Sequence, residues 1–534
     1  MQTEKQLIEA GKIVIGIELG STRIKAVLID DRGTILAAGG ADWENRLVNG
    51  IWTYSQEEIW AKLQAAYQDL QKTVKEKYRT LIRQAQAIGV SAMMHGYLPF
   101  DKQGNQLVPF RTWRNNITLQ AAQELTDLFR YPIPQRWSIA HLYQAILKDE
   151  PHIDQIDYLT TLSGYVHWRL TGEKTLGIGD ASGMFPIDTA SGDFDRNMLA
   201  LFERRIQHLN MGWRLQDILP KVRVAGESGG KLTAEGARLL DPSGNLCAGI
   251  PLCPPEGDAG TGMVATNCVR EKTGNISAGT SAFAMIVLEK ALSQVYSELD
   301  MVTTPTGKPV AMAHSQNCTT DINAWVGLLG ETLQTFGVKV CTEELYETLF
   351  LHALQGDADG GGLLAYGFHS GEHNVGLAQG CPLFLHPTNA DFNLANFIRV
   401  HLYTAFGAMK LGMDILIERE KVEITRILGH GGIFKTENVA QKVLSSALNI
   451  PLATMNTASN GGAWGIALLA SFLHKRNEGY SLEDYLDQCI FNNVKMTLST
   501  PDQSMAEGYR QFIRRYKRGI PVVQAAVDAG IGAD

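Results

Sequence analysis

Short apolar runs separated by glycine and hydroxyl residues open the chain. Residues 13–17 are apolar, residues 18–22 carry turn-forming side chains, and residues 24–29 are apolar again. This pattern predicts a β-hairpin. A second turn at residues 31–33 and an apolar run at 34–38 add a third strand. We therefore expect an antiparallel meander before the first helix.

The first helix is predicted just after this meander. Ser55 and Glu58 have the spacing of a capping box, and apolar residues recur at helical intervals from Ile59 to Tyr78. A strand is expected at residues 87–90, and it leads into Met93-Met-His-Gly96.

A similar pattern returns half a chain later. Residues 274–281 and 282–288 again give a strand, a glycine and hydroxyl turn, and a strand. This repetition suggests two domains of related design, residues 1–255 and 256–534.

The second half also mixes helices with a sheet. Helices are expected at residues 394–417, 436–447 and 505–516, and a strand at residues 423–428. The fold class is therefore α/β, with helices and sheets in both halves.

Composition narrows the function classes. The 534 residues are 45% hydrophobic and 19% charged, the balance of a folded chain with large cores. The 48 basic and 56 acidic side chains give a net charge of −8 without long blocks of one sign, so neither nucleic acid nor a membrane is an expected partner. Seven scattered cysteines, no leader and no apolar run of 18 residues favour a reduced, cytoplasmic protein.

Two turns offer phosphate-binding chemistry. Gly20-Ser21-Thr22 and Gly279-Thr280-Ser281 each present backbone N–H groups and two hydroxyls. Turns of this composition are also common in ordinary hairpins, but a nucleotide held by two domains needs one loop from each. The P-loop and Rossmann glycine patterns are missing from the sequence, which disfavours those enzymes.

Three further segments can carry chemistry. Asp258 lies in the glycine-rich run 254–262 and is either a general base or a helix N-cap. Residues 94–96 follow a predicted strand, where α/β proteins place ligand-contacting side chains, although a single histidine can equally be a packing residue. Residues 429–432 are glycine-rich and follow a strand, so they suit either the close approach of a ligand or a plain turn.

A hydrolase is the rival from another class. Residues 226–230 match the nucleophile-elbow pattern G-x-S-x-G. The preceding residues 221–225 are not a buried apolar strand, so the match lacks its structural context.

Taken in order, these segments resemble the FGGY carbohydrate kinases, from about residue 13 to residue 473. Residues 15–22 are similar to the family's first phosphate loop, residues 177–183 to its D-A-S-G segment, and Gly257-Asp258 to the pair that carries its catalytic base. Gly279-Thr-Ser281 resembles the second phosphate loop, and residues 429–432 resemble the glycine cluster beside adenosine. The resemblance implies two actin-like, ribonuclease H-like domains with a deep interdomain cleft.

Within the family, the sugar-binding motifs look like those of the ketopentose kinases. Met94-His95-Gly96 resembles the M-H-G of the xylulose kinase group, and Trp113 matches the group's W-N-D. Four positions depart from the family pattern, because Glu18 replaces an aspartate, Met93 a glutamine, Asn115 an aspartate and His373 an arginine. The matching motifs favour D-xylulose. Because of the four departures, L-ribulose, another sugar or polyol, and an actin-like ATPase without a sugar acceptor stay open.

The resemblance also assigns roles. It implies ATP as co-substrate, Mg²⁺ as the metal with Glu18 as its protein partner, Asp258 as general base, and a homodimer as a possible assembly. The expected sugar-binding residues are Met94, His95, Gly96, Trp113 and Asp258. The expected nucleotide-binding residues are Gly20, Ser21, Thr22, Lys25, Gly279, Thr280, Ser281, Gly431, Gly432 and Thr436.

Overall fold

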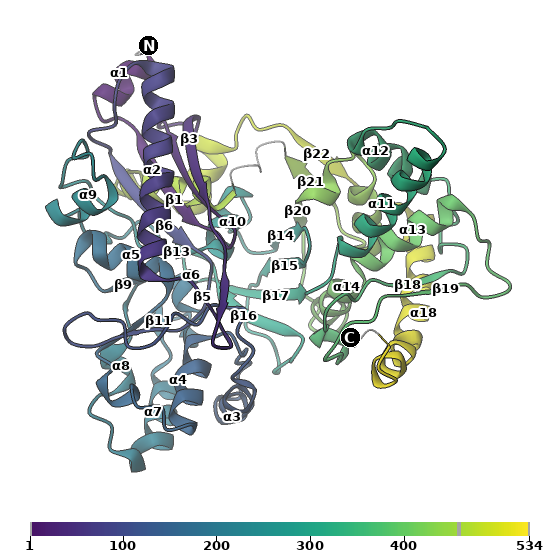
Figure 1. The fold of residues 1–534 in the computed structure, drawn as a ribbon, viewed down its shortest axis with the longest axis horizontal. Coiled ribbons are helices and arrows are strands. Elements are labelled where there is room, and N and C mark those ends of the chain that lie inside the picture. The colour runs from purple at the N-terminus through teal and green to yellow at the C-terminus, as the bar shows by residue number, and fades with distance from the viewer. Residues whose placement is uncertain (1–2, 456–460, 532–534) are drawn as a thin grey trace. The chain divides into compact units, whose positions relative to one another are not determined.

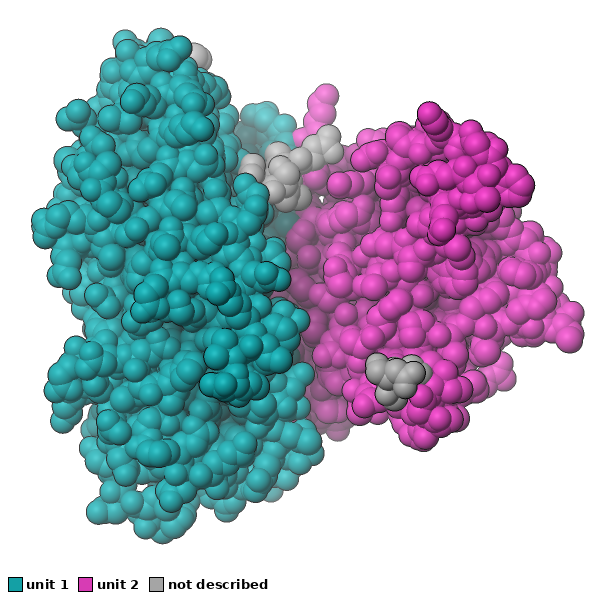
Figure 2. Space-filling view, viewed as in Figure 1, with its two compact units in different colours: residues 1–270, 301–310, 459–494 teal, residues 271–300, 311–458, 495–534 magenta. Residues whose placement is uncertain are grey.

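The computed structural model describes residues 3–455 and 461–531. The chain forms two compact units, coloured separately in Figure 2, and each unit combines segments that are distant in sequence. Unit 1 comprises Met1–Arg270, Met301–Val310 and Ser459–Val494, and unit 2 comprises Glu271–Asp300, Ala311–Ala458 and Lys495–Asp534. Because both structural units are discontinuous in sequence, they do not test the predicted domain boundary at residue 255, which stays a prediction.

A five-stranded sheet forms the centre of unit 1 (Figure 1). Its order is β13-β6-β1-β2-β3, with β13 parallel to β6, β6 parallel to β1, and β1, β2 and β3 antiparallel. The predicted meander is confirmed. The strands are β1 (Val14–Leu19), β2 (Arg23–Ile29), β3 (Ile35–Asp42), β6 (Ala87–Ala92) and β13 (Glu256–Gly257).

Two long helices cover opposite faces of this sheet. Any side chain on Gly16 of β1 would overlap the carbonyl of Ala463 in α16 (Gly461–Asn477), and any side chain on Gly39 of β3 would overlap Leu70 of α2 (Gln56–Tyr78). Gly16 pairs in register with Val27, which pairs with Ala38, so Gly16 and Gly39 face opposite sides. Glycine at both positions allows the helix backbones to lie directly on the strands.

The remaining elements of unit 1 build a second hydrophobic core around α3, α4 and α7 and complete the first. They are α1 (Glu4–Glu9), β4 (Arg46–Val48), β5 (Ile51–Thr53), β7 (Leu98–Phe100), α3 (Leu119–Phe129), α4 (Ser138–Leu147), η1 (Ile153–Gln155), β8 (Tyr158–Thr160), α5 (Leu162–Thr171), β9 (Thr175–Gly177), α6 (Ile178–Ala181), β10 (Ile187–Asp188), β11 (Asp193–Phe194), α7 (Arg196–Ile206), η2 (Gln207–Leu209), α8 (Leu215–Ile218), β12 (Lys221–Arg223), α9 (Ala234–Leu240), α10 (Asp258–Ala265), α17 (Leu482–Tyr485) and η7 (Leu486–Ile490).

Unit 2 is built on a seven-stranded sheet, of which residues 301–310 at the turn between β16 and β17 belong to unit 1. Its order is β16-β17-β15-β14-β20-β21-β22, and the predicted hairpin of β14 and β15 is confirmed. The elements are β14 (Thr273–Ala278), β15 (Ala282–Val287), β16 (Leu299–Thr303), β17 (Pro309–Ser315), α11 (Thr320–Thr335), α12 (Thr342–Ala353), β18 (Leu364–Tyr366), η3 (His373–Val375), β19 (Leu383–Leu385), α13 (Leu394–Ala405), α14 (Gly407–Asp414), η4 (Ile415–Arg419), β20 (Arg426–His430), η5 (Gly432–Phe434), α15 (Ala440–Leu448), β21 (Leu452–Met455), β22 (Met496–Ser499) and α18 (Gln503–Asp528).

Element boundaries in the second half differ from the predicted ones. The helix expected at 394–417 is interrupted between α13 and α14, where Gly407 packs against the ring of Tyr516 and leaves no room for a side chain. The helix expected from residue 436 begins at Ala440, because residues 432–434 form a separate 3₁₀ turn.

Candidate functional site

Two aromatic side chains donate hydrogen bonds to the loop between β1 and β2. The indole of Trp43 donates to the carbonyl of Gly20 (2.6 Å), and the hydroxyl of Tyr54 donates to the carbonyl of Ser21 (2.6 Å). The two rings are stacked with their centroids 4.1 Å apart. These two bonds hold the carbonyls of Gly20 and Ser21, and Thr22 is exposed at the surface.

Glu18 lies at the end of β1 and faces the start of α16. One carboxylate oxygen accepts the N–H of Ala463 (3.2 Å), and a side chain on Gly462 would overlap the other. Burial raises the pKa of Glu18 to about 7, the nearby charge of Asp258 adds to the rise, and Lys25, its cross-strand neighbour, opposes it. Glu18 thus accepts a hydrogen bond from the first turn of α16.

Asp258 is the first residue of α10. Gly257 occupies the N-cap position, so the alternative that Asp258 is the N-cap is wrong. Its Oδ1 accepts the backbone N–H of Met94 (3.0 Å), and the side chain is open to solvent. Desolvation by the surrounding protein raises the pKa of Asp258, while the bond from Met94 lowers it. This carboxylate therefore has one oxygen anchored and one available.

The segment Met94-His95-Gly96 has an unusual backbone. His95 has φ +71° and Gly96 φ +104°, a region that residues with a side chain rarely adopt. Ser138 and the carbonyl of Arg136 bind the backbone of Gly96, at 2.5 and 3.2 Å. Strained residues of this kind gather at functional sites, so the segment is a good candidate for substrate contact.

The His95 ring is buried and fixed on two sides. It is stacked on Trp137, with centroids 6.5 Å apart, and its Nδ1 lies 3.2 Å from the carbonyl of Gly183. A side chain on Gly183 would come within 2.6 Å of that nitrogen and 2.8 Å of Met94. The glycine of the D-A-S-G segment is thus required for the packing of His95.

Sequence reasoning gave no role to two buried carboxylates beside Asp258. Asp180 accepts hydrogen bonds from the hydroxyls of Thr161 (2.7 Å) and Ser163 (2.5 Å), and Glu256 accepts the N–H groups of Gly179 (3.2 Å) and Asp180 (2.9 Å). Burial raises the pKa of Asp180 to about 7 and that of Glu256 to about 8, and each group feels a neighbouring negative charge. The sequence marks Glu256 only by its neighbours, because it is an acidic residue between two prolines and a glycine.

These shifts predict a pH dependence of stability. Folded Asp180 keeps its proton up to a pKa of about 7, against an ordinary value of 3.8. Between these pH values the folded state binds a proton that the unfolded state releases, so stability falls as pH rises. The free energy of unfolding of the wild type, measured against Asp180→Asn by urea denaturation, should decline from about pH 4 to pH 7 and then level off. Parallel curves for the two proteins would contradict this.

Trp113 and Asn115 lie beside the first loop in different roles. The Trp113 indole, 38% exposed, is 3.3 Å from the hydroxyl oxygen of Ser21. Asn115 is buried and serves the backbone of Trp52, accepting its N–H (2.9 Å) and donating to its carbonyl (2.8 Å). An ionised aspartate could not make the second bond, so Asn115 stabilises the β4–β5 hairpin.

The other two departures from the family pattern also have structural places. Met93 is buried in the main core of unit 1. His373 is exposed, and its Nδ1 lies 4.0 Å from Glu372, a fully buried carboxylate whose Oε2 accepts the Ser315 hydroxyl (2.9 Å).

The expected nucleotide residues of unit 2 form their own group. Residues 279–281 connect β14 and β15, and the carbonyl of Gly279 accepts both the N–H and the hydroxyl of Thr319 (3.1 and 2.8 Å). Gly431, with φ +119°, lies so close to the carbonyl of Ala278 that a side chain would overlap it. Gly432 has open space around it, and Thr436 is half-buried in the turn that follows.

The site residues therefore form one group in each unit. Unit 1 brings together Glu18, the first loop, Trp113, the 94–96 segment and Asp258 through the contacts above. Unit 2 brings together the second loop and Gly431.

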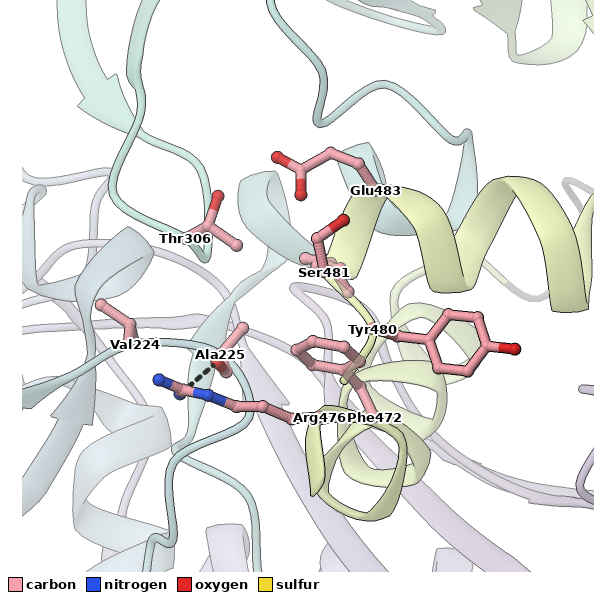
Figure 3. Close-up of a pocket in the computed structure, with 9 residues that line it drawn as sticks. Val224, Ala225, Thr306, Phe472, Arg476, Tyr480, Ser481 and Glu483 are labelled. Carbon is pink, nitrogen blue, oxygen red and sulfur yellow. Dashed lines mark hydrogen bonds between the residues drawn. The ribbon is translucent and has the colours of Figure 1, made fainter. Parts of the chain in front are cut away.

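A separate pocket of about 240 Å³ lies in unit 1 near the end of α16 (Figure 3). Arg476 donates to the carbonyl of Ala225 (3.0 Å), and Glu483 pairs with Lys308 (3.0 Å), so these charged groups already have partners. Arg476 lies 14 residues after Gly462, which corresponds to about 21 Å of helix. The pocket is accordingly distant from Glu18. Its lining residues are Val224, Ala225, Thr306, Phe472, Arg476, Tyr480, Ser481, Leu482 and Glu483.

Few side chains in the described segments could hold a metal ion. No group of three or more His, Cys, Asp or Glu side chains in residues 3–455 and 461–531 is arranged to hold a metal ion. Mg²⁺ in kinases is usually held by one or two carboxylates, water and substrate phosphates, and Glu18 fits that pattern.

In the same described segments, no helix is both long enough and apolar enough to span a bilayer.

Comparison with protein-family models identifies both parts of the chain. The N-terminal domain model of the FGGY family of carbohydrate kinases matches residues 13–259, and the C-terminal domain model matches residues 274–474. The chain belongs to the FGGY family. The expected carbohydrate kinase class is thereby confirmed at the level of the family.

Known FGGY kinases are similar over differing lengths. The xylulose kinase of Escherichia coli K12 is 26% identical over 291 residues, which are 52% of this chain and 55% of that protein. The xylulose kinase of Haemophilus influenzae is 21% identical over 94% of this chain and 98% of its own length. The first of these alignments thus spans about half of the relative.

Solved FGGY structures confirm the fold. Ligand-bound xylulose kinase and gluconate kinase, both from Lactobacillus acidophilus, each superpose with a TM-score of 0.77 at 16% identity. The first match covers 98% of this chain and 99% of the other, and the second covers 96% and 98%. The expected two-domain, actin-like α/β fold is confirmed. Two kinases named for different substrates share this fold, so the fold alone does not identify the sugar.

Proposed function

We propose that this FGGY kinase transfers the γ-phosphoryl group of ATP to the primary hydroxyl of a ketopentose, with D-xylulose favoured. The product would be the 5-phosphate. The observation that carries the proposal is the direct bond between the Met94 N–H and the Asp258 carboxylate. It joins the segment that resembles the ketose-binding motif to the candidate base.

Asp258 is proposed as the general base. Its Oδ1 is occupied by Met94, which leaves Oδ2 to accept the proton of the sugar hydroxyl. As that proton moves, the hydroxyl oxygen bonds to the γ-phosphorus, and the bond to the ADP oxygen breaks. The raised pKa of Asp258 makes the carboxylate a better proton acceptor than an ordinary surface aspartate.

Positioning supplies the rest of the catalysis, because phosphoryl transfer requires little covalent chemistry from the protein. In the sugar subsite we propose Met94, His95, Gly96 and Trp113, on unit 1. Ser21, Thr22 and Lys25 of unit 1 and Thr280 and Ser281 of unit 2 would bind phosphate oxygens, and Gly431, Gly432 and Thr436 would lie near adenosine. Glu18 would hold Mg²⁺ through water, and the ion would neutralise phosphate charge.

Replacing His95 by alanine tests the sugar subsite. A lost hydrogen bond in a desolvated site should raise the sugar KM by about tenfold or more and leave the ATP KM within about twofold. Steady-state kinetics with each substrate varied in turn would measure both constants. His208→Ala, at an exposed histidine of the same unit, is the matched control. Equal increases in the two constants would place His95 outside the sugar subsite.

ADP release from MgATP tests the proposed function. Purified protein would be assayed with D-xylulose, L-ribulose, D-ribulose, L-xylulose, glycerol, D-gluconate and no acceptor. Strong stimulation by D-xylulose supports the proposal, and stimulation by another compound would replace the sugar while keeping the kinase. A high rate without any acceptor and no stimulation would favour the sugar-free ATPase.

A further inference from the structure

Strand β13 leads directly into Asp258 and has a sheet neighbour on one side. Glu256 pairs with Ser91 and Gly257 pairs with Ala92 of β6. The other side of the strand faces the turn that contains α6, where the N–H of Gly177 binds the carbonyl of Pro255 (2.8 Å). A two-residue strand at the edge of a sheet needs such contacts to fix its end.

The Glu256 side chain makes the main contacts to that turn. It is 2% exposed, and its two oxygens accept the N–H groups of Gly179 and Asp180 at 3.2 and 2.9 Å. A side chain on Gly177 would overlap the carboxylate, and one on Gly179 would come within 2.5 Å of it. Both glycines thus make room for Glu256.

These two bonds are the ones that an N-cap residue ordinarily makes. Gly177 is the N-cap of α6 and has no side chain, and Gly179 and Asp180 are at the second and third helical positions. A side chain at residue 177 has no room for this role, because its Cβ would also come within 2.6 Å of the Pro255 carbonyl oxygen. Glu256 accepts the two N–H groups from a strand that is distant in sequence.

This arrangement costs stability. Glu256 lies next to Asp180, and a buried carboxylate beside another is unfavourable. What Glu256 adds is a link between the turn that carries Asp180 and the strand that carries Asp258.

We propose that Glu256 is a positioning residue for Asp258. By tying β13 to the 177–180 turn, it fixes the start of α10 and holds the Asp258 carboxylate against the N–H of Met94. The inference rests on the proposed function, because it assigns Glu256 an effect on the rate through the proposed base.

Refilling the space of the carboxylate separates positioning from the stability of the turn. Glu256→Ala removes the link and the cap together. Adding Gly179→Ala fills part of the vacated space, because a side chain on Gly179 meets only Glu256, and alanine favours the helix more than glycine does, so the unfolding midpoint should recover in part. The link stays broken, so kcat should remain at least about tenfold below wild type with the ATP KM within about twofold. Recovery of full kcat in the double variant would overturn the proposal.

A second readout uses Asp258 directly and needs no activity. In protein labelled with ¹⁵N-methionine, the Met94 amide proton reports on its bond to Asp258. Its resonance should move in Glu256→Gln, in Glu256→Ala and in the double variant. An unchanged Met94 resonance in Glu256→Gln would also overturn the proposal, even if the double variant did not fold.

The two experiments distinguish this inference from the proposed function. If wild-type protein phosphorylates none of the acceptors, the proposed function fails while the Met94 resonance still tests the positioning. If the wild type is active and the double variant equals it, the positioning fails and the function stands.

Discussion

Asp258→Asn should lower kcat by about two to four powers of ten, the usual contribution of a positioned general base. The amide keeps the shape of the side chain, and its oxygen can still accept the Met94 N–H. It cannot take the proton of the sugar hydroxyl at neutral pH. Because the ground-state contacts persist, the ATP KM should change by less than about threefold.

The measurement is a full kinetic comparison of Asp258→Asn with wild type, using the acceptor that stimulates ADP release most. Asp127→Asn, on the exposed side of α3, serves as the matched control and should keep wild-type turnover. Unfolding curves of both variants would exclude a loss of structure. Near-normal kcat in Asp258→Asn would remove the residue from the role of base.

Gly431→Ala should have the second large effect, on the nucleotide side. The backbone at Gly431 has φ +119° and ψ 174°, a region essentially restricted to glycine, which costs a residue with a side chain about 1–3 kcal/mol. The added methyl group would also overlap the carbonyl of Ala278, the residue directly before the second loop. Since the obstacle is backbone in the middle of a sheet, relief requires a shift of the loop at residues 279–281. The ATP KM should rise by about tenfold or more, and the sugar KM much less.

Gly327→Ala, on the exposed face of α11 in the same unit, is the matched control. A methyl group there meets open space, and Gly327 does not have a positive φ. Its ATP KM should stay within about twofold of wild type. Isothermal titration of each variant with an ATP analogue, together with unfolding curves, would measure both effects. If Gly431→Ala bound nucleotide as tightly as Gly327→Ala, the second loop would not depend on this packing.

Local chemistry explains which parts of the fold the sequence predicts well. The two hairpins, at residues 14–29 and 273–287, follow from apolar runs on either side of glycine and hydroxyl turns. Helix α2 starts where Ser55 caps it, as expected. These elements are specified by residues within a few positions of one another.

Helix boundaries are predicted less accurately where contacts with residues distant in sequence determine them. Gly407, directly after the interruption, packs against Tyr516, which is more than 100 residues away in sequence. Helix α18 continues to Asp528, well beyond the residues 505–516 expected from the pattern, and carries Pro521 within it. Periodicity describes one segment and does not show which other segment it packs against.

The residues of the candidate site also fall into two classes: those that local motifs predict, and those whose contacts join distant parts of the chain. Asp258, His95 and the two loops were selected from motifs, because their glycine and hydroxyl neighbours are adjacent in sequence. The connection of Glu18 to Ala463, and that of Glu256 to the 177–180 turn, join residues far apart in the chain. A single sequence contains no signal for such pairs beyond an acidic residue in an apolar setting.

The discontinuity of unit 1 bears on how the protein is made. Helix α16, from residues 461–477, covers β1 through Gly16 and binds Glu18, yet it is synthesised more than 400 residues after that strand. During translation, one apolar face of the five-stranded sheet therefore stays uncovered until the residues of β14 to β21 have been synthesised. Unit 2 interrupts unit 1, and the nascent chain stays vulnerable to aggregation and to chaperone capture until α16 has emerged.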